Sequence, residues 1–211
     1  MADIFEKNCV IGLYGINSVG KSVLSQKLTE KFKVCELQST DNLLKMTKYF
    51  YPENEYAHCS SCTAWKVRGS KTEVNIIEGF KGYREYVEGL INCLIQRVAA
   101  ENFTMIFEGI HFNPQCRRNN EGIVVIPVLL TLKNIEKHRQ RIIEKSNGRK
   151  ELEERLLNNM QVSRVIQDFL ISEAKEHRSI IVDTGESGGP DDSLKEILKK
   201  INDYRPYAYK N

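Results

Sequence analysis

The stretch Gly15-Ile16-Asn17-Ser18-Val19-Gly20-Lys21-Ser22 decides how this chain folds. Its pattern, Gly-x-x-x-x-Gly-Lys-Ser, lets backbone N–H groups close around an oligophosphate, while the lysine supplies a positive charge and the serine a ligand for Mg²⁺. An apolar run at Cys9–Tyr14 precedes it and a helical stretch at Lys21–Phe32 follows it, which is the context that such a loop requires. A glycine-rich turn without a ligand is the competing interpretation, which this context disfavours. We therefore expect residues 15–22, called the phosphate loop below, to bind a nucleotide.

Other short apolar runs along the chain alternate with helical stretches. We expect further strands at 33–37, 104–107, 123–132 and 179–182. Apolar residues recur with a helical period from 83 to 98 and again from 194 to 201, the second after a capping box of Ser193 and Glu196. This alternation predicts an α/β protein with a parallel sheet and helices on both faces. Together with the phosphate loop it predicts a P-loop NTPase fold.

Two regions depart from simple alternation within what we expect to be one domain, 1–211. The segment 41–72 mixes polar and aromatic residues with Pro52 and Gly69, and we expect an irregular structure there. The segment 134–160 is densely charged, with Gly148 between two helical stretches. We interpret 42–100 as an acceptor-binding region and 134–160 as a mobile lid.

Three classes of P-loop protein compete for this sequence: a small-molecule kinase, a GTPase switch, and a nucleic-acid-modifying or motor ATPase. A GTPase needs Asn-Lys-x-Asp to read guanine and Asp-x-x-Gly after a strand, and neither string occurs. The formal net charge of +3 is too small to argue for nucleic acid. A kinase that uses ATP is the favoured class.

A kinase also needs a carboxylate near the acceptor and cations that close over the transferring phosphoryl group. Asp41 follows the second expected strand and can orient the acceptor hydroxyl, although it could instead cap a helix. Glu108 ends a strand, where it can hold Mg²⁺ together with Ser22. Arg139, Arg141 and Arg149 lie in the lid, where each could also be an ordinary solvated charge. The expected catalytic residues are Lys21, Asp41, Glu108, Arg141 and Arg149.

A set of short strings gives the chain a family resemblance. Besides the phosphate loop these are Ser39-Thr40-Asp41, Glu78-Gly79-Phe80, Glu108-Gly109-Ile110-His111 with Pro114, and His138-Arg139-Gln140-Arg141. In order and spacing they resemble archaeal 2-phosphoglycerate kinases, a family that includes mevalonate 3-phosphate 5-kinase. The resemblance implies a nucleoside-monophosphate-kinase-like fold with a lid, an archaeal source, ATP and Mg²⁺ as cofactors, and a small phosphorylated hydroxy acid as substrate.

The identity of the acceptor stays open between members of that family. Ile142 and Lys145 stand where phenylalanine and arginine are typical of a 2-phosphoglycerate kinase. We therefore favour mevalonate 3-phosphate, phosphorylated at its 5-hydroxyl in the mevalonate route of isoprenoid biosynthesis, with 2-phosphoglycerate as the alternative. Such acceptors carry anionic groups, for which Arg68, Arg84 and His111 are the expected ligands beside Asp41. A nucleotide-dependent switch or an RNA-directed kinase is the alternative from another class.

The remaining features bear on location and partners. The first residues show no basic stretch followed by an apolar one, and no apolar run is long enough to span a bilayer, so we expect a cytoplasmic protein that binds neither membrane nor nucleic acid. The six cysteines are interpreted as thiols, and Cys59-x-x-Cys62 lacks the second pair that structural zinc needs. A homodimer is the candidate assembly.

Overall fold

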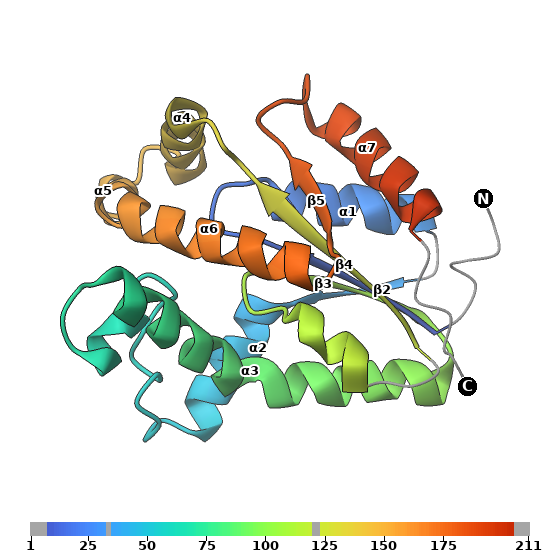
Figure 1. The fold of residues 1–211 in the computed structure, drawn as a ribbon, viewed down its shortest axis with the longest axis horizontal. Coiled ribbons are helices and arrows are strands. Elements are labelled where there is room, and N and C mark those ends of the chain that lie inside the picture. Colours follow the sequence, from blue (N-terminus) through green and yellow to red (C-terminus); the bar gives the residue numbers. More distant parts are fainter. Residues whose placement is uncertain (1–7, 33–34, 120–122, 205–211) are drawn as a thin grey trace.

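A computed structural model describes residues 8–32, 35–119 and 123–204, and within these ranges it shows a parallel sheet between layers of helices (Figure 1). The strands lie in the order β2-β3-β1-β4-β5, and every neighbouring pair is parallel. Their bounds are Cys9–Tyr14 for β1, Cys35–Ser39 for β2, Thr104–Glu108 for β3, Val124–Thr131 for β4 and Ile180–Asp183 for β5. The parallel sheet predicted from the sequence is therefore confirmed.

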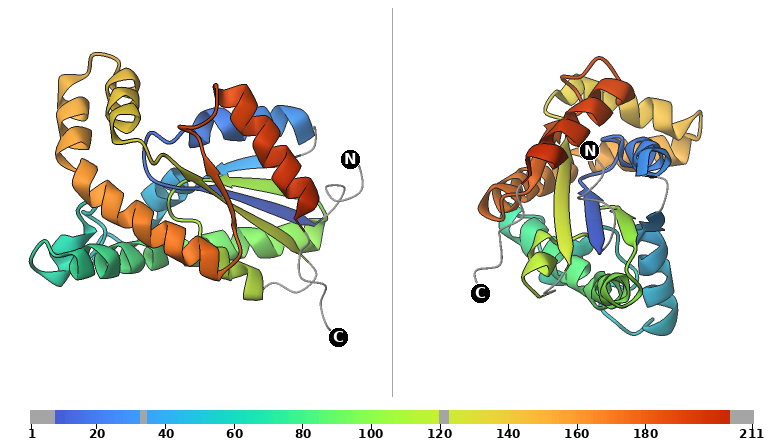
Figure 2. Two further views of the ribbon diagram at one scale, coloured as in Figure 1. Left: turned by 45° about the horizontal axis from the view of Figure 1, so that its top comes forward. Right: turned by 90° about the vertical axis from the view of Figure 1, so that its right-hand side faces the viewer.

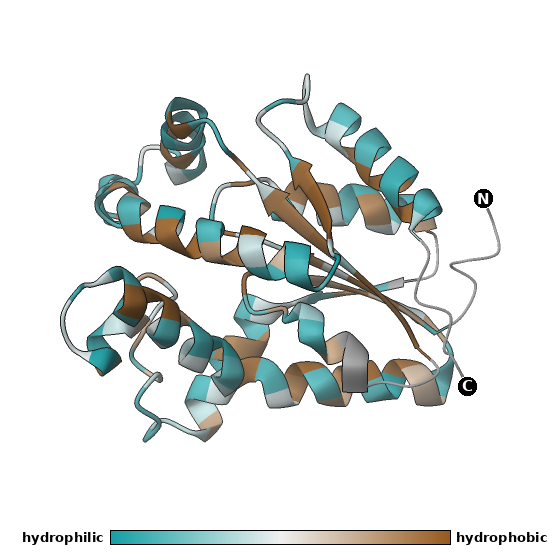
Figure 3. Cartoon of the chain, in the orientation of Figure 1, coloured by the Kyte–Doolittle hydropathy of each residue, from teal (hydrophilic) through white to brown (hydrophobic). Residues whose placement is uncertain are grey.

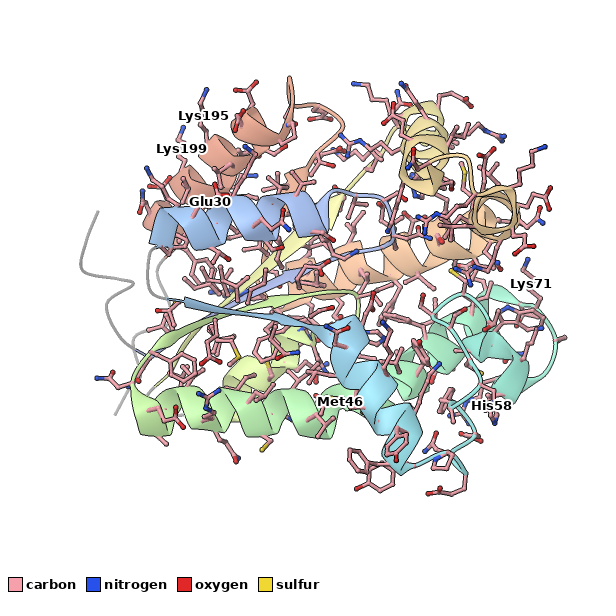
Figure 4. The ribbon with its side chains drawn as sticks, turned by 180° about the vertical axis from the view of Figure 1, so that it is seen from behind. Glu30, Met46, His58, Lys71, Lys195 and Lys199 are labelled. Atoms are coloured by element: carbon pink, nitrogen blue, oxygen red, sulfur yellow. The ribbon has the colours of Figure 1, made fainter. Side chains whose placement is uncertain are left out.

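Helices cover both faces of this sheet (Figure 2). Helices α1 and α7 pack together on one face, while α3 and α6 pack together on the other, with α2 beside α3. Figure 4 shows Glu30, Lys195 and Lys199 pointing outward from the first layer, and Met46, His58 and Lys71 on the opposite side. The helices are α1 Lys21–Phe32, α2 Thr40–Phe50, α3 Glu73–Glu101, α4 Ile135–Ser146, α5 Lys150–Asn158, α6 Met160–Glu176 and α7 Pro190–Asp203, with 3-10 turns η1 Ala64–Arg68 and η2 Pro114–Asn119.

The core sits on the central strands, which appear as continuous apolar ribbons in Figure 3. Every residue of β1 is buried, and so is every residue of β4 after Val124. Strands enclosed on both faces need continuous apolar runs rather than alternation. At Gly12 a side chain would overlap the ring of Phe112, so β1 and the segment after β3 pack in direct contact. A firmly packed β1 fixes the starting point of the phosphate loop.

Several predicted elements match the structure closely, and others were wrong. Strand β1 and helix α1 have the predicted bounds. Strand β2 covers 35–39, whereas the predicted strand was 33–37; residues 33–34 of that prediction lie outside the described part of the chain. The expectation of irregular structure throughout 41–72 is wrong, because residues up to Phe50 continue α2. Leu43, Leu44 and Thr47 lie on its buried face, but Met46 and Tyr49 are exposed, so apolar residues outside the buried face hid the helical period.

The capping box predicted for the last helix is also wrong. Helix α7 begins at Pro190 with Gly189 at its N-cap position. Proline suits the first turn of a helix because its missing N–H would have no partner there. Ser193 therefore lies inside the helix, where its hydroxyl is 2.6 Å from that of Ser187.

None of the helices in the described part of the chain combines the length and the apolarity needed to cross a bilayer.

Candidate active site

The phosphate loop connects the end of β1 to the start of α1 in a shape that the sequence requires. Gly15 and Gly20 have φ angles of 146° and 95°, a region that favours glycine. A side chain at Gly15 would also collide with the carbonyl oxygen of Leu130 on β4. Helix α1 begins at Lys21, so its N-terminus faces the loop and favours an anion there.

Lys21 is held inside this loop. Its Nζ donates a hydrogen bond to the carbonyl oxygen of Ile16 at 2.7 Å. Burial lowers the pKa of Lys21 to about 8, while the negative charges of Glu108 and Asp41 act in the opposite direction. The ammonium group therefore lies near both predicted carboxylates, Glu108 and Asp41.

Ser22 and Glu108 present oxygen atoms to the same point. The Ser22 hydroxyl donates to Oε1 of Glu108 at 3.3 Å, across 86 positions of sequence. A hydroxyl and a carboxylate are ligands of the kind that Mg²⁺ accepts, and this ion keeps several waters and takes further oxygens from phosphates. The described residues contain no cluster of three or more His, Cys, Asp or Glu side chains suited to a metal, so His58, Cys59 and Cys62 do not form one. Ser22 and Glu108 fit a nucleotide-bound magnesium ion.

A cavity of about 620 Å³ opens in front of the phosphate loop. This volume lies within the range usual for sites that enclose small ligands. Beside the loop, its lining includes Asp41 on α2, Ser61, Glu108 at the end of β3, Ile110, Arg141, Glu144 and Lys145 from α4, and Thr184, Pro190 and Ser193. Elements from both ends of the chain thus enclose one space.

Asp41 enters this cavity from the first turn of α2. Its side chain is 72% exposed, while the preceding Thr40 is buried. Thr40 fits closely against Gly109, where a side chain would overlap the threonine hydroxyl. Ser39 occupies the N-cap position of α2. Asp41 is therefore not the capping residue, and its exposed side chain lines the cavity.

His111 lies beside Asp41 but outside the cavity lining. The ring is 1% exposed, with Nδ1 at 3.0 Å from the Thr40 hydroxyl and 3.7 Å from Oδ1 of Asp41. Burial lowers the pKa of His111 to about 4. The ring is therefore neutral near pH 7 and lacks the charge that the sequence analysis expected it to offer an acceptor anion.

The two arginines expected to bind the acceptor lie elsewhere. Arg84 is buried and makes two hydrogen bonds of 2.7 Å to the carboxylate of Glu173 on α6. Arg68 lies 3.9 Å from Glu55 and stacks over the ring of Tyr56. Neither side chain lines the cavity. The partner of Arg84 is distant in sequence, and the partners of Arg68 lie in an irregular segment, so local sequence patterns reveal neither contact.

The lid contributes one of the two predicted arginines to the cavity and one cation that was not predicted. Arg141 lines the cavity and donates to the hydroxyl and carbonyl oxygens of Thr184, both at 2.7 Å. Arg149 instead donates to the carbonyl oxygens of Ser146 and Lys145 and does not line it. Lys145 does, and its charge contributes to the lowered pKa of Lys21. The signal that could have found Lys145 is its spacing of four residues from Arg141, which places both on one helix face.

The sheet order, phosphate loop and lid helices together define a P-loop kinase fold. The structure is similar to shikimate kinase from Acinetobacter baumannii, with a TM-score of 0.53 at 16% identity over 92% of this chain and 93% of that one. It is also similar to a gluconokinase from Sinorhizobium meliloti, with a TM-score of 0.51 at 12% identity over 93% and 95% of the two chains. Deoxyadenosine kinase from M. mycoides gives a TM-score of 0.51 at 12% identity over 92% and 100%. These likenesses confirm the fold.

Sequence comparison agrees with the resemblance to archaeal 2-phosphoglycerate kinases that the short sequence motifs indicated. The 2-phosphoglycerate kinase of Pyrococcus horikoshii is 28% identical over 195 residues, covering 91% of this chain and 62% of its own length. That of Methanocaldococcus jannaschii is 26% identical, covering 79% and 55%. Mevalonate-3-phosphate 5-kinase of Thermoplasma acidophilum is 24% identical, covering 76% and 81%. The chain thus spans little more than half the length of these 2-phosphoglycerate kinases. No protein-family model matches it.

Proposed function

We propose that this protein is an ATP-dependent kinase that transfers the γ-phosphoryl group to a hydroxyl of a phosphorylated hydroxy acid. The observation that carries the proposal is the convergence of the phosphate loop, Asp41 and Glu108 on one cavity. Asp41 and Glu108 are both close enough to affect the pKa of Lys21. A nucleotide-dependent switch would not need an exposed carboxylate facing the end of the phosphate chain.

The proposed mechanism relies on positioning. Ser22 and Glu108 would hold Mg²⁺, which neutralises the charge that develops on the phosphate oxygens. Asp41 orients the acceptor hydroxyl and takes its proton late, as the hydroxyl oxygen bonds to the γ-phosphorus and the bond from that phosphorus to the β-phosphate oxygen breaks. Lys21, Arg141 and Lys145 surround the transferring group with positive charge. In a loose transition state this arrangement matters more than a strong base.

Mevalonate 3-phosphate is the acceptor that we favour, and 2-phosphoglycerate is the second candidate. Lys145, which lines the cavity, stands where a 2-phosphoglycerate kinase typically has arginine. The proposal includes a cytoplasmic location, an archaeal source and a homodimer as the candidate assembly.

The test is a direct assay of the purified protein with ATP, Mg²⁺ and each acceptor in turn. Phosphorylated product, followed by phosphorus NMR, is expected with mevalonate 3-phosphate. The Lys21→Ala variant should lose several orders of magnitude in turnover with an unchanged circular dichroism spectrum. Product with 2-phosphoglycerate instead would reverse the order of the two acceptors. ATP binding without turnover on any phosphorylated hydroxy acid would favour the switch, and salt-sensitive RNA binding would favour the RNA-directed kinase.

Replacing Asp41 tests the proposed mechanism separately from nucleotide binding. We expect Asp41→Asn to lower kcat by about 10²–10⁴-fold, because the amide cannot take the acceptor proton. ATP affinity, measured by calorimetry, should change little. Asp168→Asn, at an exposed position of α6, is the matched control. A loss confined to ATP affinity would contradict the role given to Asp41.

A further inference from the structure

His138 on α4 makes a direct contact with the phosphate loop. Its side chain is fully buried, and Nε2 lies 3.2 Å from the carbonyl oxygen of Asn17. Since a carbonyl oxygen can only accept, Nε2 must carry the proton in this hydrogen bond. Burial lowers the pKa of His138, which agrees with a neutral ring in that tautomer. A buried imidazole on the lid helix thus fixes one peptide group of the loop.

The carbonyl group of Val19 is a second loop carbonyl held by a hydrogen bond, and its donor, Thr184, is bonded to α4. The Thr184 hydroxyl donates to the carbonyl oxygen of Val19 at 2.9 Å and accepts from Arg141 of α4 at 2.7 Å. Lys137, the residue before His138, donates to the carbonyl oxygen of Gly185 at 2.6 Å. Helix α4 is therefore attached to the phosphate loop directly through His138 and indirectly through Thr184.

The direction of these carbonyls decides where the loop aims its N–H groups. In a planar trans peptide the carbonyl oxygen of one residue and the N–H of the next point in opposite directions. A hydrogen bond that draws the Asn17 carbonyl toward His138 consequently turns the Ser18 N–H away from α4. The bond from Thr184 to Val19 does the same for the N–H of Gly20. The N–H groups of the loop are the donors that hold a nucleotide's phosphates.

We propose that His138 is a positioning residue of the nucleotide site, which holds the Asn17 carbonyl and so preorganises the Ser18 N–H for phosphate binding. The inference rests on nucleotide binding by the phosphate loop, as the proposed function does, but it does not depend on the acceptor or on phosphoryl transfer. Helix α4 would then order the phosphate loop in addition to supplying positive charge. Loss of the imidazole donor should weaken nucleotide binding because the loop then has to be ordered by the nucleotide itself.

Two substitutions separate the donor from the packing of the ring. In glutamine the amide nitrogen can reach the position of Nε2, whereas in asparagine it reaches only that of Nδ1. We expect His138→Asn to raise the Kd of ADP and of ATP about tenfold, as is typical of one lost hydrogen bond in a preorganised site. His138→Gln should stay within about threefold of the native value. Glu136→Gln, exposed on the same helix, is the control.

Calorimetric titration of the whole protein with ADP and ATP makes the comparison, together with steady-state kinetics and thermal unfolding. The KM for ATP should rise in His138→Asn while kcat and the acceptor KM change little. Thr184→Val, which removes the hydroxyl that holds Val19, should weaken nucleotide binding as well, and gives a second readout if His138→Asn fails to fold. The inference would be overturned if His138→Asn and His138→Gln lost equal nucleotide affinity. It would also be overturned if the affinity of each variant simply tracked its unfolding temperature. Nucleotide binding without phosphoryl transfer would overturn only the proposed function.

Discussion

Lys145 in the last turn of α4 and Arg149 at the N-cap of α5 differ in what they face. Lys145 lines the cavity, whereas the guanidinium of Arg149 donates to the carbonyl oxygens of Ser146 and Lys145 at the end of α4. We expect Lys145→Ala to lower kcat about tenfold or more, because it removes a cation from the transferring phosphoryl group. Arg149→Ala should lower kcat no more than about threefold.

Steady-state kinetics at saturating ATP tests this difference, and Lys145→Arg serves as the matched control because it keeps the charge. An Arg149→Ala defect larger than that of Lys145→Ala would contradict the geometry. It would mean that the end of the helix rearranges when both substrates are bound.

We expect Lys21 to make the affinity for nucleotide depend on pH. Burial has lowered its pKa to about 8, so the charged form dominates below this pH and is lost above it. A bound polyphosphate favours the charged form, and binding therefore takes up a proton at high pH. We expect the affinity for ADP to be constant from about pH 7 to 8 and then to fall by up to about tenfold per pH unit.

Calorimetry across this range measures the effect. Lys21→Arg should flatten the profile, because a guanidinium keeps its charge throughout. An affinity for ADP that is unchanged in the native protein up to about pH 9.5 would show that Lys21 does not titrate there.

At the scale of elements, Arg84 and Glu173 join α3 to α6 through a buried ion pair. Both oxygens of the carboxylate accept from the guanidinium, and both side chains are about 5% exposed. We expect Arg84→Met or Glu173→Gln to lower the free energy of unfolding by about 3–5 kcal/mol, because each leaves a buried partner unmatched. The double variant Arg84→Met with Glu173→Leu should recover much of that loss.

Urea unfolding of the single and double variants tests this expectation. The acceptor KM of the double variant then reports on the role that the sequence suggested for Arg84. A KM close to the native value agrees with a structural ion pair, whereas a large increase would show that Arg84 also reaches the acceptor.

The elements differ in how far sequence reasoning could define them. Strand β1, helix α1 and the loop between them follow from a local pattern, and their bounds were predicted closely. Helix α2 was missed because its apolar positions lie among exposed residues such as Met46 and Tyr49. In the site, Ser22, Glu108 and Asp41 follow strand ends, where topology alone brings side chains together. The Glu173 partner of Arg84 is 89 positions away, so no local pattern could reveal it.

At the scale of the whole molecule, the lid contains two helices with different attachments. Helix α4 is tied to the phosphate loop and to the segment after β5, whereas α5 has no buried residue. Between them Asn147 and Gly148 both have positive φ angles. We propose that the moving part of the lid begins after α4. The mobile segment would then start at Asn147 rather than at residue 134, as expected from the sequence.

Hydrogen exchange followed by mass spectrometry tests this division. In the free protein the amides of α4 should exchange slowly and those of 147–159 rapidly, because few buried contacts oppose local opening there. Adding ATP, Mg²⁺ and the acceptor should slow exchange mainly in 147–159. Equally rapid exchange along α4 in the free protein would mean that the entire segment moves as one lid.

The order of the strands separates residues 40–101 from the segments around α4 and β5. The chain from Thr40 to Glu101 lies along the β2 and β3 edge, while α4, α6 and the segment after β5 border the other side of the phosphate loop. Among the described residues, contacts that cross between these halves include the ion pair of Arg84 with Glu173, the rings of Phe80 and Phe169, and Cys62 with Ser163, whose Sγ and Oγ lie 3.2 Å apart. A chimera that exchanges residues 40–101 with those of a relative would thus need matching residues at 163, 169 and 173, and could then change its acceptor without rebuilding the nucleotide side.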